Sequence, residues 1–307
     1  MSTHAAAALG GVNVAALTPR QRGETRVDPG AMVPLLEFLA GSGVQGIVVM
    51  GTTGEFAHFD CEERRRFVEQ AVRSSRLPVA VCVAHATLDG ALSLARAAAG
   101  AGAAALLIMP PYFFRYRQPE VKEFLLRFAA ELKGAAPIYL YNIPFFTNEL
   151  AAETAIELLS TGLFAGIKDS SGRWENFVKL RAARQRCGFR LLVGNDVLFA
   201  PARAAGADGV ISGCACAIPE LLVALDRVIV SGDAGGRDRL DARLHEFIAW
   251  ADSFPTPVAI REALSVRGFR TGPHAVPLSP EQQRRLAQFR TWFAEWLPQV
   301  LEECSHA

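Results

Sequence analysis

The stretch Ala40-Gly41-Ser42-Gly43-Val44-Gln45-Gly46-Ile47-Val48 takes the chain from a helical pattern, through glycine, into a short apolar run. Glycine is expected just after the last turn of a helix, and an unbroken run of Val and Ile is typical of a strand buried on both faces. The same passage returns at residues 98–106 (A-A-G-A-G-A-A-A-L) and 204–211 (A-A-G-A-D-G-V-I). This loose repetition indicates strands that alternate with helices.

On both sides of these passages, short apolar runs alternate with longer helical patterns as far as residue 230. The expected strands are Gly11–Thr18, Gly46–Met50, Val79–Ala84, Ala104–Met109, Ile138–Ile143, Ala165–Lys168, Arg190–Val193 and Gly209–Ser212. The expected helices are Pro29–Ser42, Cys61–Ser74, Leu88–Ala99, Pro119–Lys133, Ala152–Ser160, Trp174–Arg186, Leu198–Ala205 and Pro219–Val230. Strands that are each followed by a helix, eight times over, predict an α/β fold of the (β/α)8 TIM barrel type.

The rest of the chain is wholly helical in its pattern. Helices are expected at Ala234–Ala251, Thr256–Val266 and Pro280–Glu303. We therefore predict a barrel over residues 1–230 and a C-terminal helical extension, residues 231–307, that packs on the barrel. A doubly wound open sheet is the main alternative, but the G-x-G-x-x-G turn that follows the first strand of a dinucleotide-binding sheet is absent.

Composition bounds the partners and the compartment. The chain has 307 residues, half of them hydrophobic, and a net charge of +1, so nothing favours nucleic acid or an anionic membrane as a partner. The first residues lack the pattern of a signal peptide, and no apolar run reaches membrane-spanning length. None of the six cysteines forms a C-x-x-C pair, and no His, Asp or Glu spacing argues for a metal. We expect a cytoplasmic protein with free thiols and no metal site.

A lysine stands near the end of the sixth expected strand. The stretch Phe164–Gly172 (F-A-G-I-K-D-S-S-G) predicts a strand and a turn, and Lys168 falls where they meet. Because burying an unpaired ammonium group is costly, such a lysine must pair its charge, lower its pKa, or reach water with its head group. A neutral lysine is a nucleophile that can form a Schiff base with a carbonyl. Gly166, on the same strand face, is expected to leave room for the lysine stem and a substrate.

Other candidates stand at the same ends of neighbouring strands, where the active sites of barrels form. The second strand runs into Gly51-Thr52-Thr53-Gly54-Glu55, whose amides and hydroxyls can converge on a carboxylate, although a plain tight turn is an equal reading. The fifth strand presents Tyr141 at the mouth, where it either relays protons or fills space. Gly194 at the end of the seventh strand and Ile211 in the eighth are counted among the candidate substrate-binding residues.

Three motifs now stand in order on successive strands: Gly51-Thr52-Thr53-Gly54-Glu55, Tyr141-Asn142-Ile143-Pro144 and Gly166-Ile167-Lys168-Asp169. In order and spacing they resemble the dihydrodipicolinate synthase/N-acetylneuraminate lyase superfamily. The resemblance extends from Gly11 to the helical C-terminus and is specific for the superfamily rather than for one member.

The resemblance implies a class I mechanism on pyruvate or another 2-oxo acid. Lys168 matches the lysine that forms the imine, and Tyr141 matches the tyrosine that shuttles protons. Thr52 and Thr53 match the pair that binds the 2-oxo acid carboxylate, with Gly51 in the same turn. A protonated imine is itself an electron sink, so no metal or organic cofactor is implied. Family members are commonly tetramers or dimers, so a homotetramer or homodimer is expected.

Two departures from the dihydrodipicolinate synthases concern the substrate. In those enzymes a tyrosine at one position reaches into the neighbouring subunit and takes part in its proton relay. This chain has Phe113 there, so either Tyr112 replaces that tyrosine or the proton relay is broken. Those enzymes also grip the aldehyde's carboxylate with an arginine where this chain has Phe146, and losing such a charge-assisted contact costs about 1.5–3 kcal/mol. We expect Tyr112 and Phe146 to line the substrate site of a member that does not make dihydrodipicolinate.

The sequence thus predicts a lyase that cleaves or condenses a 4-hydroxy-2-oxo acid, of the 2-keto-3-deoxy sugar acid type or less polar, into pyruvate and an aldehyde. Alternatives that share the imine are a dehydratase of a 2-keto-3-deoxy sugar acid and a dihydrodipicolinate synthase-like condensation. The non-enzyme alternative is a regulatory barrel that only binds a 2-oxo acid. Lys168, Tyr141 and Thr52 together argue against it, because a pure binding site has little need of all three.

Overall fold

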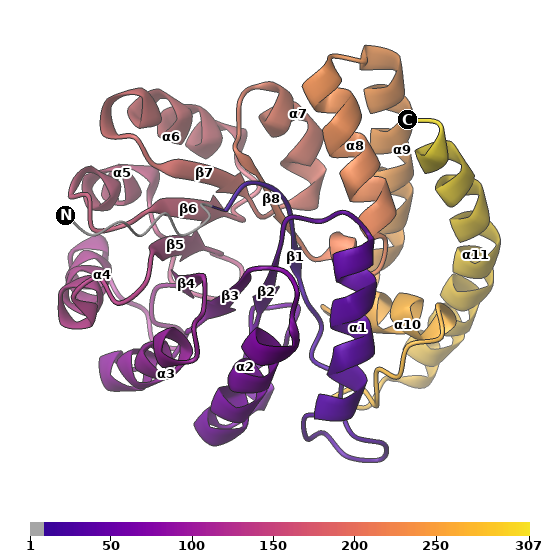
Figure 1. Ribbon diagram of the computed structural model, residues 1–307, viewed down its shortest axis with the longest axis horizontal. Coiled ribbons are helices and arrows are strands. Elements are labelled where there is room, and N and C mark those ends of the chain that lie inside the picture. Colours follow the sequence, from indigo (N-terminus) through magenta and orange to yellow (C-terminus); the bar gives the residue numbers. More distant parts are fainter. Residues whose placement is uncertain (1–8) are drawn as a thin grey trace.

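Eight parallel strands form the centre of the computed structural model, which describes residues 9–307. Each strand pairs with its neighbours in sequence order, and β8 pairs with β1, so the sheet closes into a barrel. The strands are β1 (Gly11–Ala15), β2 (Gly46–Val49), β3 (Val79–Cys82), β4 (Ala105–Ile108), β5 (Ile138–Asn142), β6 (Gly166–Asp169), β7 (Arg190–Val193) and β8 (Gly209–Ser212). The predicted TIM barrel is confirmed, and Figure 1 shows helices arranged around its strands.

One helix follows each strand and covers the outside of the barrel. These helices are α1 (Pro29–Gly41), α2 (Cys61–Ser74), α3 (Leu88–Gly100), α4 (Gln118–Leu132), α5 (Ala152–Ser160), α6 (Trp174–Cys187), α7 (Phe199–Ala204) and α8 (Pro219–Ser231). Their starts follow from local chemistry. Asp60, for example, accepts a hydrogen bond from the Glu63 amide (2.8 Å) and so satisfies a backbone donor that the first turn of α2 leaves free.

The first strand is shorter than expected and ends at Ala15 instead of Thr18. The Ala16 amide still donates to the Val48 carbonyl (2.9 Å), but the Thr18 hydroxyl donates to the Gly54 carbonyl (2.7 Å). Residues 16–18 therefore leave the sheet and bind the turn that follows β2. This contact helps to fix the turn that contains Thr52 and Thr53.

Three further helices form the C-terminal extension, namely α9 (Ala234–Ala251), α10 (Val258–Val266) and α11 (Pro280–Ser305). They pack on α8 and on one another at one side of the barrel, shown in orange to yellow in Figure 1. Aromatic rings join α9 to α11, and the ring centroids of Phe247 and Trp296 lie 6.0 Å apart. These rings bury the apolar faces of both helices against each other, so they hold the extension together.

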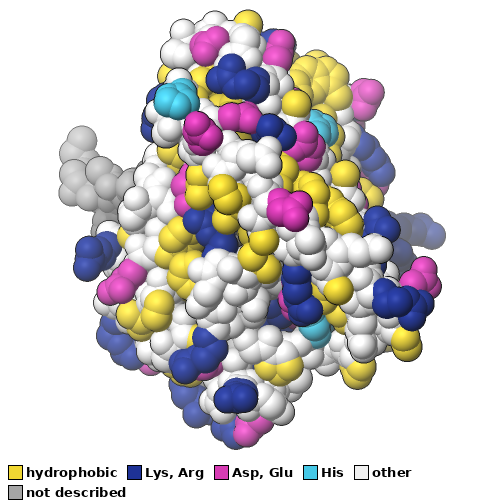
Figure 2. Space-filling model, turned by 90° about the vertical axis from the view of Figure 1, so that its right-hand side faces the viewer, with side chains coloured by type: hydrophobic (Ala, Val, Ile, Leu, Met, Phe, Trp, Pro, Cys, Tyr) yellow, Lys and Arg dark blue, Asp and Glu magenta, His cyan; other side chains and the backbone are white. Residues whose placement is uncertain are grey.

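Charges of both signs are mixed over the surface. Figure 2 shows the side of the molecule that lies at the right of Figure 1, with basic and acidic side chains interspersed. All six cysteines lie in the described part of the chain and are unpaired. Within residues 9–307, none of the helices combines the length and the apolar character that a membrane span requires.

Candidate active site

The three predicted catalytic side chains meet at the carboxyl end of the barrel. Tyr141 and Lys168 are direct neighbours in the register of β5 and β6, so their side chains share a face. Lys168 Nζ lies 4.2 Å from the centroid of the Tyr141 ring, and Thr52 Oγ1 lies 3.1 Å from the Tyr141 hydroxyl. Lys168 and Tyr141 are both buried. An amine, a phenol and a hydroxyl thus stand together in a site screened from bulk water.

These side chains line a cavity of about 400 Å³, a size that suits a small molecule. Seven of the nine predicted site residues line it, namely Thr52, Thr53, Tyr141, Phe146, Lys168, Gly194 and Ile211. Five residues of the extension complete the wall, namely Ile248, Ala251, Asp252, Thr256 and Ile260. The extension is therefore part of the site. No pattern in the sequence indicated this, because the contact depends on how α9 and α10 pack on the barrel.

Two predicted site residues do not line the cavity. Gly51 opens the turn after β2, and its carbonyl accepts a hydrogen bond from the Phe56 amide (3.4 Å). Tyr112 is half-buried and packs edge-on against the ring of Phe56, with centroids 5.6 Å apart. Burial raises the pKa of the Tyr112 phenol, an effect that nearby Arg64 opposes. Tyr112 is not among the residues that line the cavity of its own chain. Its predicted contact with substrate stays a prediction.

The space that receives the lysine stem lies beside Gly194, and the expectation for Gly166 was wrong. A Cβ added at Gly166 would meet the Arg190 carbonyl (2.4 Å) and the Tyr139 ring (2.7 Å). A Cβ at Gly194 would instead meet Lys168 Cε at 2.5 Å. Gly194 is thus required by the close approach of the lysine side chain, which comes from the neighbouring strand.

Four further polar residues from the barrel line the cavity and were not predicted, namely Ser170, Asn195, Asp196 and Cys214. Ser170 is buried, two residues beyond Lys168 on the same face, and among the described residues its hydroxyl has no hydrogen-bond partner. Burial raises the pKa of Asp196, an effect that hydrogen bonds and nearby Lys168 oppose. Burial and the neighbouring Asp196 also raise the pKa of the Cys214 thiol well above its usual range, which favours the thiol over the nucleophilic thiolate. Period-two alternation beyond Lys168 is the signal that would have found Ser170.

Comparison with known proteins shows the family of the chain. The family model of the dihydrodipicolinate synthetase family matches residues 8–294. The chain belongs to this family. It is accordingly an enzyme of the pyruvate-dependent class I aldolase superfamily, whose members are lyases and aldolases.

Relatives of the family are similar over nearly their whole length. A 4-hydroxy-tetrahydrodipicolinate synthase of Methanothrix thermoacetophila is 30% identical over 91% of this chain and 94% of its own. The enzyme of that name from Neisseria gonorrhoeae is 32% identical over 92% of this chain and 97% of its own. The crystal structure of a dihydrodipicolinate synthase from Aquifex aeolicus superposes with a TM-score of 0.87 at 27% identity and covers 94% of this chain and 98% of that one.

The ionisable side chains that line the cavity include few cations. Its ionisable lining consists of the amine of Lys168, the phenol of Tyr141, the Cys214 thiol, and the carboxylates of Asp196 and Asp252; of the residues described, no arginine and no second lysine contributes. Phe145 and Phe146 contribute exposed rings at its rim. Among the described residues, Lys168 is thus the only cationic side chain that lines the cavity.

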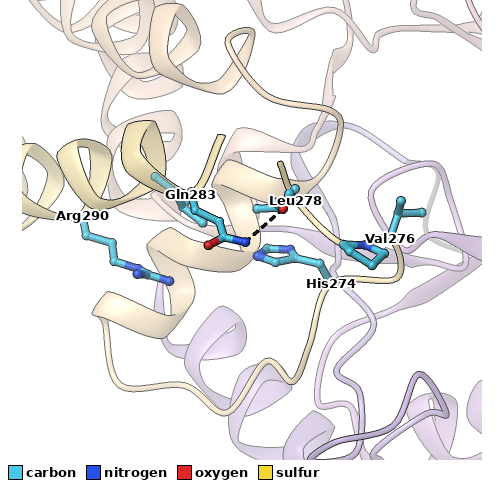
Figure 3. A pocket seen from close by; sticks show the side chains of 7 residues that line it. His274, Val276, Leu278, Gln283 and Arg290 are labelled. Carbon is cyan, nitrogen blue, oxygen red and sulfur yellow. Dashed lines mark hydrogen bonds between the residues drawn. The ribbon is translucent and has the colours of Figure 1, made fainter. Parts of the chain in front are cut away.

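Another cavity, of about 550 Å³, lies in the extension beside His274, Gln283 and Arg290 (Figure 3). Glu262 accepts contacts there from His274 (3.0 Å) and Arg290 (2.7 Å). Burial opposes ionisation of Glu262, yet the hydrogen bonds from His274 and Arg290 lower its pKa. Among the described residues, no lysine lines this second cavity. Among residues 9–307, no group of three or more His, Cys, Asp or Glu side chains is placed to hold a metal ion.

Proposed function

We propose that this protein is a Schiff-base lyase that cleaves, or reversibly forms, a 4-hydroxy-2-oxo acid to give pyruvate and an aldehyde. The observation that carries the proposal is the buried amine of Lys168 beside Tyr141, whose hydroxyl lies 3.1 Å from Thr52 Oγ1. An amine nucleophile, a proton carrier and a hydroxyl that orients it are the groups that imine formation and carbon–carbon cleavage need.

The reaction follows from these groups. The Lys168 amine attacks the C2 carbonyl of the acid and forms a carbinolamine. Tyr141 gives its phenolic proton to the departing hydroxyl, so water leaves and a protonated imine and a phenolate remain. The Tyr141 phenolate takes the proton of the C4 hydroxyl as the C3–C4 bond breaks, so the aldehyde leaves and the bonding electrons pass to the imine as an enamine. Tyr141 returns this proton to C3, and water then hydrolyses the imine, which releases pyruvate, the free amine and the neutral phenol. The imine is the only electron sink required, so we propose that the reaction needs no metal and no organic cofactor.

The turn after β2 is suited to the carboxylate of the 2-oxo acid. Thr52 and Thr53 place two hydroxyls on the cavity, and Thr53 is buried. Gly213 allows this packing, because a Cβ there would lie 2.9 Å from Thr53 Oγ1. We propose that hydroxyls and backbone amides of this turn hold the carboxylate while Lys168 attacks the neighbouring carbonyl.

The aldehyde half is proposed to be neutral and partly apolar. Phe145 and Phe146 form the rim on its side, and the carboxylates of Asp196 and Asp252 disfavour a second anion. The buried hydroxyl of Ser170 is a hydrogen-bonding group for a hydroxyl of the substrate.

A dihydrodipicolinate synthase-like condensation is the second candidate, because relatives at 30% and 32% identity carry the name 4-hydroxy-tetrahydrodipicolinate synthase. Phe146 and the absence of a lining arginine among the described residues count against it, since the aldehyde of that reaction carries a carboxylate. A dehydratase of a 2-keto-3-deoxy sugar acid shares the imine and the proton carrier, and only its products distinguish it.

Borohydride trapping tests the proposal. Incubation with pyruvate and sodium borohydride is expected to add a reduced pyruvyl group to Lys168, located by peptide mapping, and Lys168→Ala is expected to abolish both the adduct and turnover. The same pyruvyl adduct after incubation with a longer 4-hydroxy-2-oxo acid means carbon–carbon cleavage, whereas a longer adduct that lacks one water means dehydration. Full activity of Lys168→Ala would overturn the mechanism. No adduct from any acid, in a folded protein, would favour the regulatory barrel that only binds.

We also propose that the protein works as a homodimer or homotetramer in the cytoplasm. Members of the family are commonly oligomeric. Exposed aromatic rings follow β4 and β5, and aromatic side chains are enriched in interfaces between subunits. Six unpaired thiols fit a reducing compartment.

A further inference from the structure

We propose that Arg261, on helix α10 of the extension, is a positioning residue for the carboxylate of the 2-oxo acid. Together with Arg20 it holds Glu55 and thereby fixes the turn that carries Thr52 and Thr53. We call Arg20, Glu55 and Arg261 the Glu55 clamp. The proposal rests on the function proposed above, since it concerns the same carboxylate.

The contacts of the Glu55 clamp are divided between the two arginines. Arg20 Nη2 lies 3.1 Å from Glu55 Oε1, and Arg261 Nη2 donates a hydrogen bond to Glu55 Oε2. The exposed fractions are 0% for Arg20, 1% for Arg261 and 8% for Glu55. Each carboxylate oxygen is thus bound by a different buried guanidinium, and such charge-assisted contacts are among the strongest in a protein.

Arg261 also joins the extension to the start of the chain. Its guanidinium donates to the carbonyl of Thr18 (3.3 Å) and to the carbonyl of Thr271. Thr18 in turn donates its hydroxyl to the Gly54 carbonyl (2.7 Å). The same turn is therefore held twice, at Gly54 through Thr18 and at Glu55 through its side chain.

The backbone of the turn needs this support. Glu55 has a φ of 54°, a left-handed conformation that non-glycine residues adopt at a cost and keep only where their surroundings impose it. Its amide donates to the Thr52 carbonyl (3.0 Å), so Glu55 and Thr52 close the turn between them. If the grip on the Glu55 carboxylate is lost, the strained turn is free to relax. Thr52 and Thr53 then leave the positions from which they reach the cavity and Tyr141.

The charge of the clamp also suits an anion. Two guanidinium groups face the Glu55 carboxylate, which His58 Nδ1 also approaches at 3.3 Å, and the Glu262 carboxylate acts on Arg261 as well. Burial of both guanidinium groups limits the screening of their charge by salt. We infer that the clamp shapes the turn and, through its two arginines, favours a carboxylate at Thr52 and Thr53. An ion pair that served only stability would not distinguish a carboxylate from a neutral group there.

The test compares Arg261→Met with Arg267→Met, which breaks the ion pair of Arg267 with Glu220 elsewhere on the extension. Borohydride trapping is measured over a range of concentrations of pyruvate and of its neutral analogue pyruvamide. We expect Arg261→Met to raise the pyruvate concentration that gives half-maximal trapping about tenfold. A change of this size corresponds to the loss of one charge-assisted contact. The pyruvamide concentration for half-maximal trapping should change much less. Arg267→Met should change neither.

Amide hydrogen exchange without ligand gives an independent readout. Peptides that contain residues 51–56 should exchange faster in Arg261→Met than in the wild type or in Arg267→Met. Unchanged exchange in this turn, or equal loss of pyruvate and pyruvamide trapping, would overturn the positioning role. If Arg261→Met does not fold, Arg261→Lys, which keeps the charge and loses the several donors of the guanidinium group, is expected to show a smaller change of the same kind. If borohydride traps no pyruvate on the wild-type protein, the proposed function is refuted. Amide hydrogen exchange would still decide whether Arg261 fixes the turn.

Discussion

At the scale of single residues, Asp196 shows how the site differs from an optimised core. Its Oδ1 is buried without a hydrogen-bond partner among residues 9–307, and Oδ2 receives the Cys214 amide at the long distance of 3.5 Å. Burial raises the pKa of this carboxyl, because desolvation penalises the charged form more than hydrogen bonds and Lys168 favour it. A poorly satisfied carboxylate at a cavity wall costs stability and is available to a substrate.

We expect Asp196→Asn to stabilise the protein at neutral pH and to do so less at low pH. A carboxyl whose pKa is raised on folding binds its proton more tightly in the folded state, so wild-type stability falls as the pH rises from about 4, the ordinary Asp range, through the raised pKa. Asparagine cannot ionise and lacks this decline. Urea unfolding at a series of pH values measures the difference, with the exposed Asp238→Asn as control. A gain in free energy of unfolding that is the same at pH 4 and pH 8 would contradict the assignment.

At the scale of elements, local signals predicted most of the structure. The strands β2 to β8 lie where unbroken apolar runs stand in the sequence, because strands covered on both faces need no polar alternation. The end of β1 was missed because Thr18 leaves the sheet to bind Gly54, which is 36 residues away in the chain. A boundary set by such a contact has no local signal.

The cap of α2 allows a test at this scale. Replacing Asp60 by alanine removes the acceptor of the Glu63 amide, so we expect a loss of about 1 kcal/mol in free energy of unfolding. Asp60→Asn keeps an accepting oxygen and should cost only a few tenths of that amount. Chemical denaturation of both variants measures the loss, and neither should change kcat, since Asp60 does not line the cavity. Equal losses in the two variants would mean that charge, not the cap, is what matters.

At the scale of the whole molecule, exposed aromatic rings distinguish one region of the surface. Phe113 and Phe114 are 88% and 64% exposed and pack edge to face with centroids 5.1 Å apart. Phe113 also has a φ of 79°, which is strained for a bulky side chain. Exposed rings of this kind are typical of surfaces that another protein covers, and the homo-oligomer proposed above would place a second copy there.

We therefore expect Phe113→Ser/Phe114→Ser to weaken self-association, because it removes apolar area from that surface. Sedimentation velocity at several concentrations measures the effect. Val230→Ser, which changes an apolar side chain of α8 that is also exposed, is the matched control and should sediment as the wild type does. A monomeric wild type, or a double variant with unchanged association, would show that these rings have another purpose.

The sequence by itself determined the barrel and the meeting of Thr52, Tyr141 and Lys168. The reason is geometric, because parallel strands bring their carboxyl ends to one face of the barrel, and residues placed at those ends must lie near one another. Only the tertiary structure decided which glycine makes room for the lysine, how the extension walls the cavity, and that Arg261 grips Glu55. Arg261 and Glu55 are 206 residues apart, and their contact follows from where α10 packs, which no local propensity encodes.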